Sequence, residues 1–166
     1  MSKIPSYLLS LAGEYRVCSE LNLRGVFATV TYGNRKSVDV YAISDRGERA
    51  LKIEVKTSQR KNFVTNFKQK YLNLEDSHAP DFWVLLQVQF NDGSRRQDRF
   101  FVLTHGEMRD AQKARDDVYS AKYFAKHARQ PDASTGVDNV LVEDVAGFED
   151  AWEKIIKSIG GPEIAS

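Results

Sequence analysis

The stretch from Ser37 to Ser58 constrains the fold of this chain more than any other. It reads SVDVYAISDRGERALKIEVKTS, with apolar and polar residues alternating on both sides of the turn-forming segment Asp45–Glu48. Alternation with a period of two is typical of β-strands, so the stretch predicts two antiparallel strands joined by a turn. Asp39 then falls on the first strand, while Glu54 and Lys56 project from the same face of the second.

Composition predicts one globular domain over residues 1–166 and excludes several classes of protein. The chain is 42% hydrophobic and 28% charged, which is ordinary for a globular protein, and its net charge of +1 means that any nucleic-acid binding must come from local clusters. A single cysteine, Cys18, excludes an internal disulfide, and three scattered histidines make a structural zinc site improbable. No apolar run is long enough to cross a membrane, and the N-terminus does not resemble a signal peptide. We therefore expect a cytoplasmic protein.

Residues 6–23 predict a helix with one buried acid. We expect its apolar stripe to consist of Leu8, Leu11, Tyr15, Cys18 and Leu21. Glu14 falls on the same face, where an unpaired charge would be costly, so it needs either a salt bridge, for instance to Lys56, or a role as a metal or water ligand. Glu20 has an arginine four residues away on each side and is expected in a solvated row of ion pairs.

The remaining elements predict an α/β sandwich with a central mixed sheet, without a regular βαβ alternation. Further strands are expected at 26–32, 82–90 and 98–104, with a short edge strand at 140–145. Thr104 and Glu107 have the spacing of a capping box that opens a helix. A last amphipathic helix is expected from Phe148 to Ile159, and a short helix with an aromatic face at Phe63, Phe67 and Tyr71.

The segment after Val55 is basic. No acid occurs between Val55 and Leu74. The candidate contacts to a nucleic-acid backbone are Arg60, Lys61, Lys68 and Lys70, with Arg95, Arg96 and Arg99 as weaker candidates. Such contacts position a strand and weaken steeply with salt, but they carry no base information. The alternative is that the interleaved aromatic residues cover the core and the cations are merely solvated.

The order of an acid on the first helix, Asp39, and then Glu54-Val55-Lys56 resembles the PD-(D/E)xK nuclease superfamily. The segment from Gly13 to Thr57 is similar to archaeal-type Holliday junction resolvases and related restriction-endonuclease-like proteins. Val38 stands where the proline of the motif's name would be. The resemblance implies a restriction-endonuclease-like α/β/α sandwich.

The resemblance also implies a role for each residue. Asp39 and Glu54 would hold Mg²⁺ or Mn²⁺ together with the main-chain carbonyl of Val55, since hard cations prefer oxygen ligands. Lys56 would orient or deprotonate the attacking water and offset phosphate charge. Glu14 would hold a water of the metal or a second ion. The expected catalytic set is therefore Glu14, Asp39, Glu54 and Lys56.

Three functions remain open at this point. The first is a metal-dependent endonuclease that hydrolyses DNA in repair, recombination or defence. The second is a Holliday junction resolvase, which would act as a homodimer so that two sites cut symmetric strands. The third is a non-catalytic nucleic-acid-binding or assembly module that keeps the nuclease fold. A separate alternative for Glu54 and Lys56 is that they form the charged face of an exposed strand.

Overall fold

The fold is built on a five-stranded mixed sheet. The computed structural model describes residues 4–31, 38–68, 79–91, 95–132 and 137–160. The strands lie in the order β1-β2-β3-β5-β6, and only β3 and β5 run parallel. Their bounds are β1 Phe27–Val30, β2 Val40–Ile43, β3 Ala50–Ser58, β5 Phe82–Asn91 and β6 Arg95–Thr104. The predicted α/β sandwich with a central mixed sheet is thus confirmed.

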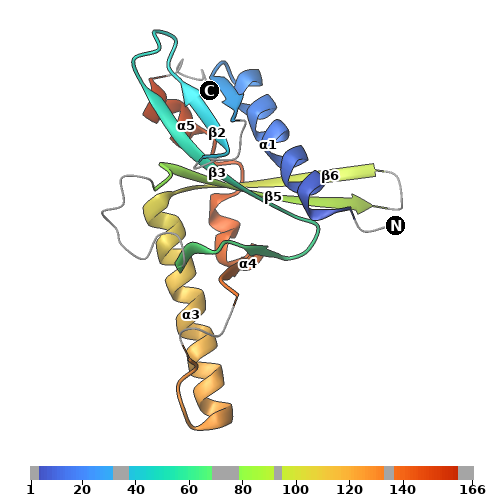
Figure 1. The fold of residues 1–166 in the computed structure, drawn as a ribbon, viewed down its shortest axis with the longest axis vertical. Helices are drawn as coiled ribbons and strands as arrows, with labels where there is room; N and C mark the ends of the chain where they lie inside the picture. Colours follow the sequence, from blue (N-terminus) through green and yellow to red (C-terminus); the bar gives the residue numbers. More distant parts are fainter. Residues whose placement is uncertain (1–3, 32–37, 69–78, 92–94, 133–136, 161–166) are drawn as a thin grey trace.

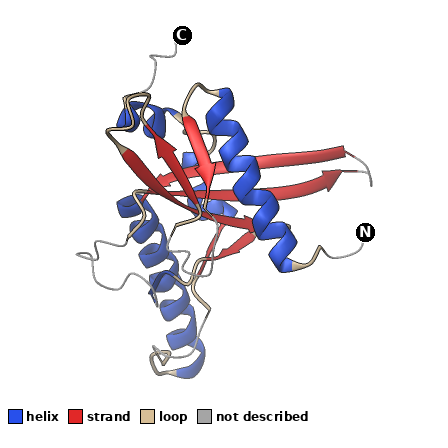
Figure 2. Ribbon diagram, turned by 45° about the horizontal axis from the view of Figure 1, so that its top comes forward, coloured by secondary structure: helices blue, strands red, loops and turns tan. Residues whose placement is uncertain are grey.

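Helices cover both faces of this sheet (Figures 1 and 2). On one face, α1 (Ser6–Leu23) and α5 (Glu153–Ile159) share an apolar core with β3 and its neighbours. The other face is covered by α3, by α4 and by a second, two-stranded sheet of β4 and β7. Their bounds are α3 His105–His127, α4 Val142–Val145, β4 Asn62–Val64 and β7 Asn139–Leu141. No helix in the described ranges is long and apolar enough to cross a membrane.

Local signals placed several boundaries correctly. The first helix spans Ser6–Leu23 as expected, and Gly25 follows it with a φ of +77°, a conformation that glycine adopts without strain. The β2–β3 hairpin turns at Gly47, whose φ is +68°. The Thr104 capping box is present, with Glu107 N–H donating to Thr104 Oγ1 and Thr104 N–H donating to Glu107 Oε2.

The predicted buried stripe of α1 is confirmed at Leu21 and partly at Cys18, which packs against the core, but it was wrong at its other three positions. Leu8, Leu11 and Tyr15 are 44%, 39% and 46% exposed. The face that α1 buries consists of Gly13, Glu14, Val17 and Leu21. A glycine lets the helix backbone approach the sheet more closely than a leucine would, so the helix turns its small residue inward.

Three downstream predictions also need correction. Phe63 lies in β4 rather than in a helix; Tyr71 lies outside the described residues. The segment expected as one strand at 140–145 is split between β7 and α4, because only its first residues pair with β4. The last helix starts at Glu153, after a 3-10 turn at Ala146–Phe148. Trp152 is buried in the core, as expected.

Candidate active site

The middle strand of the sheet, β3, carries Glu54 and Lys56. Ile53 and Val55 point into the core beneath α1 and α5, so the alternation of the strand directs Glu54 and Lys56 to the opposite face. Glu54 is only 4% exposed, because both faces of a central strand are covered. The alternative of an exposed, solvated charged face is therefore wrong for Glu54.

Glu54 and Lys56 form an ion pair over an aromatic ring. Lys56 Nζ lies 2.6 Å from Glu54 Oε1, and the lysine side chain is about one-fifth exposed (21%). Trp83 on β5 is the cross-strand partner of Glu54, and its ring centroid lies 6.0 Å from Lys56 Nζ. The ammonium group thus contacts a carboxylate and faces an aromatic ring, and the lysine side chain stays partly exposed to solvent.

Asp39 lies at a local irregularity immediately before β2. Its N–H donates to the carbonyl of Ile53 at 3.2 Å, although the strand register pairs Ile53 with Val40. Two residues of one strand therefore face a single residue of the other, which is the arrangement of a β-bulge. The bulge turns the Asp39 carboxylate toward β3, where its Oδ2 accepts the N–H of Val55 at 2.8 Å.

The main-chain carbonyl of Val55 points to the same side of β3 as its N–H. Within a strand, the N–H and C=O of one residue point to the same neighbour. Because the Val55 N–H points to Asp39, its carbonyl also points to the β2 side, beyond the position where the ladder of β2 and β3 ends at Val40 and Ile53. Asp39, Glu54 and this carbonyl thus converge at the end of the β2–β3 ladder.

Glu14 reaches this region from α1. It is 6% exposed, and the residue before it, Gly13, packs directly on Thr57 of β3. A Cβ at position 13 would lie 1.7 Å from Thr57 Oγ1, so only glycine allows the helix to sit this close. The Thr57 hydroxyl is buried and finds no hydrogen-bond partner among the residues that the structure describes. This contact fixes the height of Glu14 above the sheet.

The pKa of Asp39 is shifted by burial and by the charges of Glu14, Glu54 and Lys56. Burial raises the pKa of Asp39 most, and the negative charges of Glu54 and, more weakly, Glu14 raise it further. The hydrogen bond from Val55 N–H and the charge of Lys56 act in the opposite direction without cancelling the rise. Glu14, Glu54 and Lys56 therefore all lie near enough to Asp39 to act on its pKa, and the catalytic role of the four residues stays a prediction.

A divalent cation matches the chemistry of this donor set. Two carboxylates and a main-chain carbonyl are hard oxygen ligands, and a cation would offset the negative charges of Glu54 and Glu14, which add to the effect of burial on the Asp39 pKa. No group of three or more His, Cys, Asp or Glu side chains in the described segments is arranged to hold a metal ion by itself. The set of Asp39, Glu54 and the Val55 carbonyl contains only two such side chains, and one oxygen of Glu54 contacts Lys56.

The residues predicted to contact nucleic acid differ in their exposure and in their ion-pair partners. Arg60 and Lys61 are exposed directly after β3, whereas Lys70 and the side chains of Arg95 and Arg96 lie outside the described residues. Arg99 is held by Glu149 through two contacts of 2.7 Å. Their contact with nucleic acid stays a prediction.

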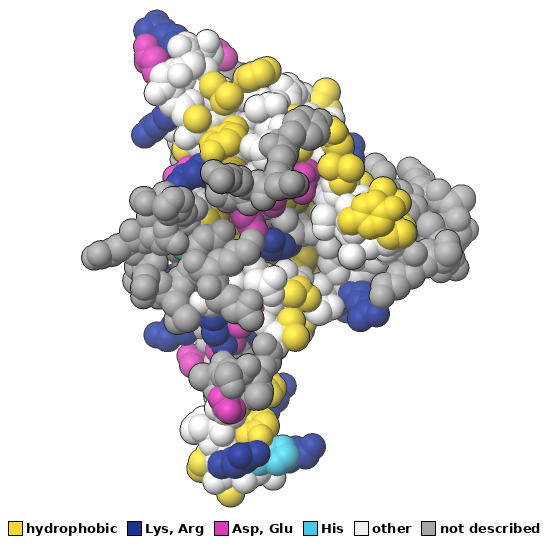
Figure 3. Space-filling model, viewed as in Figure 1, with side chains coloured by type: hydrophobic (Ala, Val, Ile, Leu, Met, Phe, Trp, Pro, Cys, Tyr) yellow, Lys and Arg dark blue, Asp and Glu magenta, His cyan; other side chains and the backbone are white. Residues whose placement is uncertain are grey.

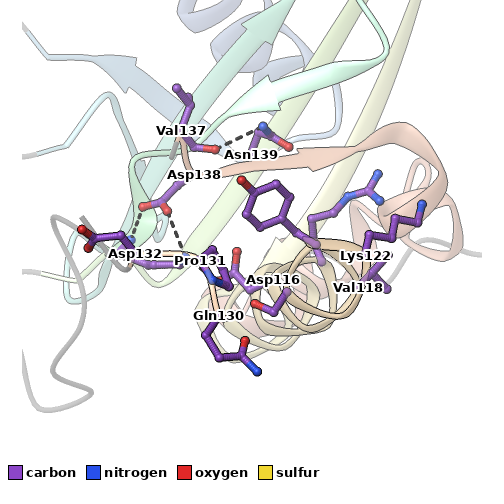
Figure 4. A pocket seen from close by; sticks show the side chains of 13 residues that line it. Asp116, Val118, Lys122, Gln130, Pro131, Asp132, Val137, Asp138 and Asn139 are labelled. Atoms are coloured by element: carbon purple, nitrogen blue, oxygen red, sulfur yellow. Dashed lines mark hydrogen bonds and ion pairs between the residues drawn. The ribbon is translucent and has the colours of Figure 1, made fainter. Parts of the chain in front are cut away.

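Lys68 is held by acids. Its Nζ lies 2.9 Å from Asp116 and 3.5 Å from Asp138. Both aspartates line a cavity of about 540 Å³ between α3 and the segment before β7 (Figure 4). Burial alone would lower the Lys68 pKa, but Asp116 and Asp138 raise it above its ordinary value.

Sequence reasoning missed two residues that shape this site. Trp83, against which Lys56 lies, sits in a continuous apolar run that gave no sign of its position. Gly13 did offer a signal, because glycine inside a predicted helix often marks a close approach of backbone to a neighbour. Thr57, the residue that Gly13 contacts, directly follows the Glu54-Val55-Lys56 run in the sequence.

Comparison with known proteins finds similarity among solved structures alone. No protein-family model matches the chain, and no curated protein matches it. Among solved structures, a bacterial homing endonuclease, I-Ssp6803I, is similar over 95% of this chain and 96% of that chain, with a TM-score of 0.49 and 13% sequence identity.

Proposed function

We propose that this protein is a metal-dependent endonuclease that hydrolyses phosphodiester bonds in DNA, with a site of the PD-(D/E)xK type. The observation that carries the proposal is the convergence of Asp39, Glu54 and Glu14 beside one amine, Lys56, at the open end of the β2–β3 ladder. Clustered acids repel one another and cost stability, so a purely structural reason for burying them together is weak.

Each residue has a defined task in this proposal. Asp39 and Glu54, with the Val55 carbonyl, would hold Mg²⁺ or Mn²⁺, which when bound supplies Lewis-acid neutralisation of phosphate charge and an activated water. Lys56 would position the attacking water and take up or offset charge at the scissile phosphate. Glu14, fixed by the Gly13–Thr57 contact, would orient a water on the α1 side of the site.

Cleavage of defined substrates tests the proposal. Supercoiled plasmid, a linear duplex and a four-way junction would each be incubated with the protein in Mg²⁺, in Mn²⁺ and in EDTA. We expect metal-dependent cleavage, and Lys56→Ala should lower the rate by about 10²–10⁴-fold, the usual loss when a positioned proton-transfer group is removed.

Matched control variants separate the site from the rest of the surface. Glu20→Gln changes a carboxylate on the same helix as Glu14, where Glu20 pairs with Arg16 and Arg24, and should leave cleavage unchanged. Glu14→Gln should lower it. Robust cleavage that survives Lys56→Ala would remove the assignment, and preference for the junction by a dimeric species would select the resolvase.

The non-catalytic module has one observation in its favour. The 2.6 Å ion pair lets Lys56 neutralise Glu54 without any metal, so the pair could be a closed structural unit. Under that alternative the protein would bind duplex DNA equally well in EDTA and Mg²⁺ and would cut none of the three substrates. Absence of Mg²⁺ binding by calorimetry would support it.

A further inference from the structure

The distal part of α3 and the residues after it, Val118 to Arg129, form a projection that we call the basic arm. In Figures 1 and 2, α3 runs away from the central sheet, and its C-terminal end lies at the extremity of the molecule. Figure 3 shows Lys, Arg and His side chains gathered at this end together with apolar ones. The arm is remote from the core, so packing against the sheet does not explain its composition.

Charge is segregated along the helix. The part of α3 before Val118 mixes acids with bases, whereas no Asp or Glu occurs from Val118 to Gln130. Within the arm lie Lys122, Lys126, His127 and Arg129, and all of them are exposed. A run of cations on a protruding element creates a local positive potential, although the chain as a whole carries a net charge of only +1.

The arm has no buried residue, and its Val118, Tyr119 and Lys122 line the cavity between α3 and the segment before β7. The residues of α3 that are buried, Met108 and Gln112, both belong to its first half. In the arm, Val118, Tyr119 and Phe124 are 44%, 50% and 51% exposed. Exposed apolar side chains that are grouped, rather than scattered, mark surfaces that meet another molecule.

The aromatic side chains of the arm are engaged with one another. The rings of Tyr119 and Tyr123 lie 6.0 Å apart, and those of Tyr123 and His127 lie 4.4 Å apart. Arg129 lies over the Tyr123 ring at 5.9 Å and donates from Nη2 to its hydroxyl at 3.2 Å. Tyr123 therefore contacts Tyr119, His127 and Arg129 within the arm.

We propose that the basic arm binds the phosphate backbone of duplex DNA. The inference rests on the proposed nuclease function and adds to it a second contact region, separate from the residues that follow β3. Charge complementarity selects the partner, since a duplex carries one phosphate charge per about 1.7 Å of its axis. A helix about 10–12 Å wide also fits a major groove about 12 Å wide.

The position of the arm relative to the candidate active site supports the same partner. His105, the first residue of α3, accepts a hydrogen bond at Nδ1 from Trp83 Nε1 at 3.2 Å, and Trp83 lies next to Lys56. A helix of 23 residues is about 34 Å long at about 1.5 Å per residue. That length is about one turn of duplex DNA. A duplex that is bound at the candidate active site and runs along α3 would therefore reach the arm about one turn away.

Salt-dependent binding tests the inference without any cleavage. The probe is a fluorescein-labelled 40-base-pair duplex in EDTA, titrated with the full-length protein from 50 to 200 mM salt. The arm variant is Lys122→Gln/Lys126→Gln, and the matched control is Arg46→Gln/Lys157→Gln, which removes the same charge from exposed positions on the β2–β3 turn and α5. Glutamine keeps helix propensity at the three helical positions, Lys122, Lys126 and Lys157.

We expect the arm variant to lose about 1.8 from the slope of log K against log salt, since each phosphate contact contributes about 0.9. Between the two salt concentrations the wild-type protein would then lose about 12-fold more affinity than the arm variant. The control pair should keep the wild-type slope. A single-stranded 40-mer should bind more weakly than the duplex.

The other outcomes overturn the inference. If the arm variant and the control pair share the wild-type slope, the arm does not contact DNA, and the nuclease proposal stands or falls separately on Lys56→Ala. If a Tyr119→Ser/Phe124→Ser variant is monomeric while the wild-type protein is dimeric by light scattering, the arm is a protein interface. Tighter binding of the single strand would instead assign the arm to base stacking.

Discussion

The close contact of Gly13 with Thr57 makes a prediction whose magnitude follows from the coordinates. In Gly13→Ala the new Cβ would lie 1.7 Å from Thr57 Oγ1, 2.9 Å from its Cβ and 3.2 Å from its Cγ2. Overpacking of this kind usually costs about 1–3 kcal/mol. The upper end applies here, because Thr57 is β-branched and sits on the central strand, where it has few rotamers to choose from.

The net effect is smaller because alanine favours the helix. Replacing a helical glycine with alanine gains about 0.8–1.0 kcal/mol. The expected net loss is therefore about 2 kcal/mol in the free energy of unfolding. For a domain of this size that loss corresponds to a fall in Tm of about 4–8 °C. Urea denaturation followed by circular dichroism gives the free energy directly.

Two further variants make the argument refutable. Thr57→Ala removes Oγ1 and Cγ2 but leaves the Thr57 Cβ at 2.9 Å, so in that background Gly13→Ala should cost clearly less than the about 2 kcal/mol expected in the wild-type protein. Gly106→Ala is the matched control, since its Cβ would meet nothing closer than 4.0 Å and should not destabilise. If Thr57→Ala gives no rescue, or if both glycine variants behave alike, the contact does not position α1.

Two predictions concern Asp39. Its raised pKa means that the native state binds the proton more tightly than the unfolded state, so stability is lost as pH rises from the ordinary carboxyl value of 3.8 through the native pKa. Asp39→Asn should therefore raise Tm at pH 7, with a gain that shrinks below about pH 4; an equal gain at both pH values would contradict this. Mg²⁺ at ten times its Kd should stabilise the wild-type protein by about 1.4 kcal/mol, or about 3–6 °C in Tm. The same Mg²⁺ should leave the Tm of Asp39→Asn nearly unchanged, and an equal shift in both proteins would place the cation elsewhere.

The sequence predicted the parts of the fold that depend on local patterns. The hairpin from β2 to β3, the bounds of α1 and the capping box at Thr104 each follow from alternation, turn residues or caps within a few positions. The meeting of Asp39 with the Glu54–Lys56 strand followed from the same hairpin, because antiparallel pairing brings these positions together.

Features set by tertiary packing could not be predicted in this way. Leu8 and Leu11 have the hydrophobicity and spacing of a buried face, yet the helix buries Gly13 and Glu14 because close backbone approach outweighs side-chain size. Phe63 matches a helical spacing with Phe67, but it pairs in β4 with a strand far away in the sequence. The bulge at Asp39 likewise depends on pairing geometry rather than on residue type.

The most direct measurement of the central claim is the anomalous scattering of Mn²⁺ in crystals of the protein. Our account predicts a single strong peak at the end of the β2–β3 ladder, in contact with the carboxylates of Asp39 and Glu54 and with the carbonyl of Val55. The peak should vanish in Asp39→Asn. A Mn²⁺ concentration that supports DNA cleavage but leaves this position empty would contradict the account.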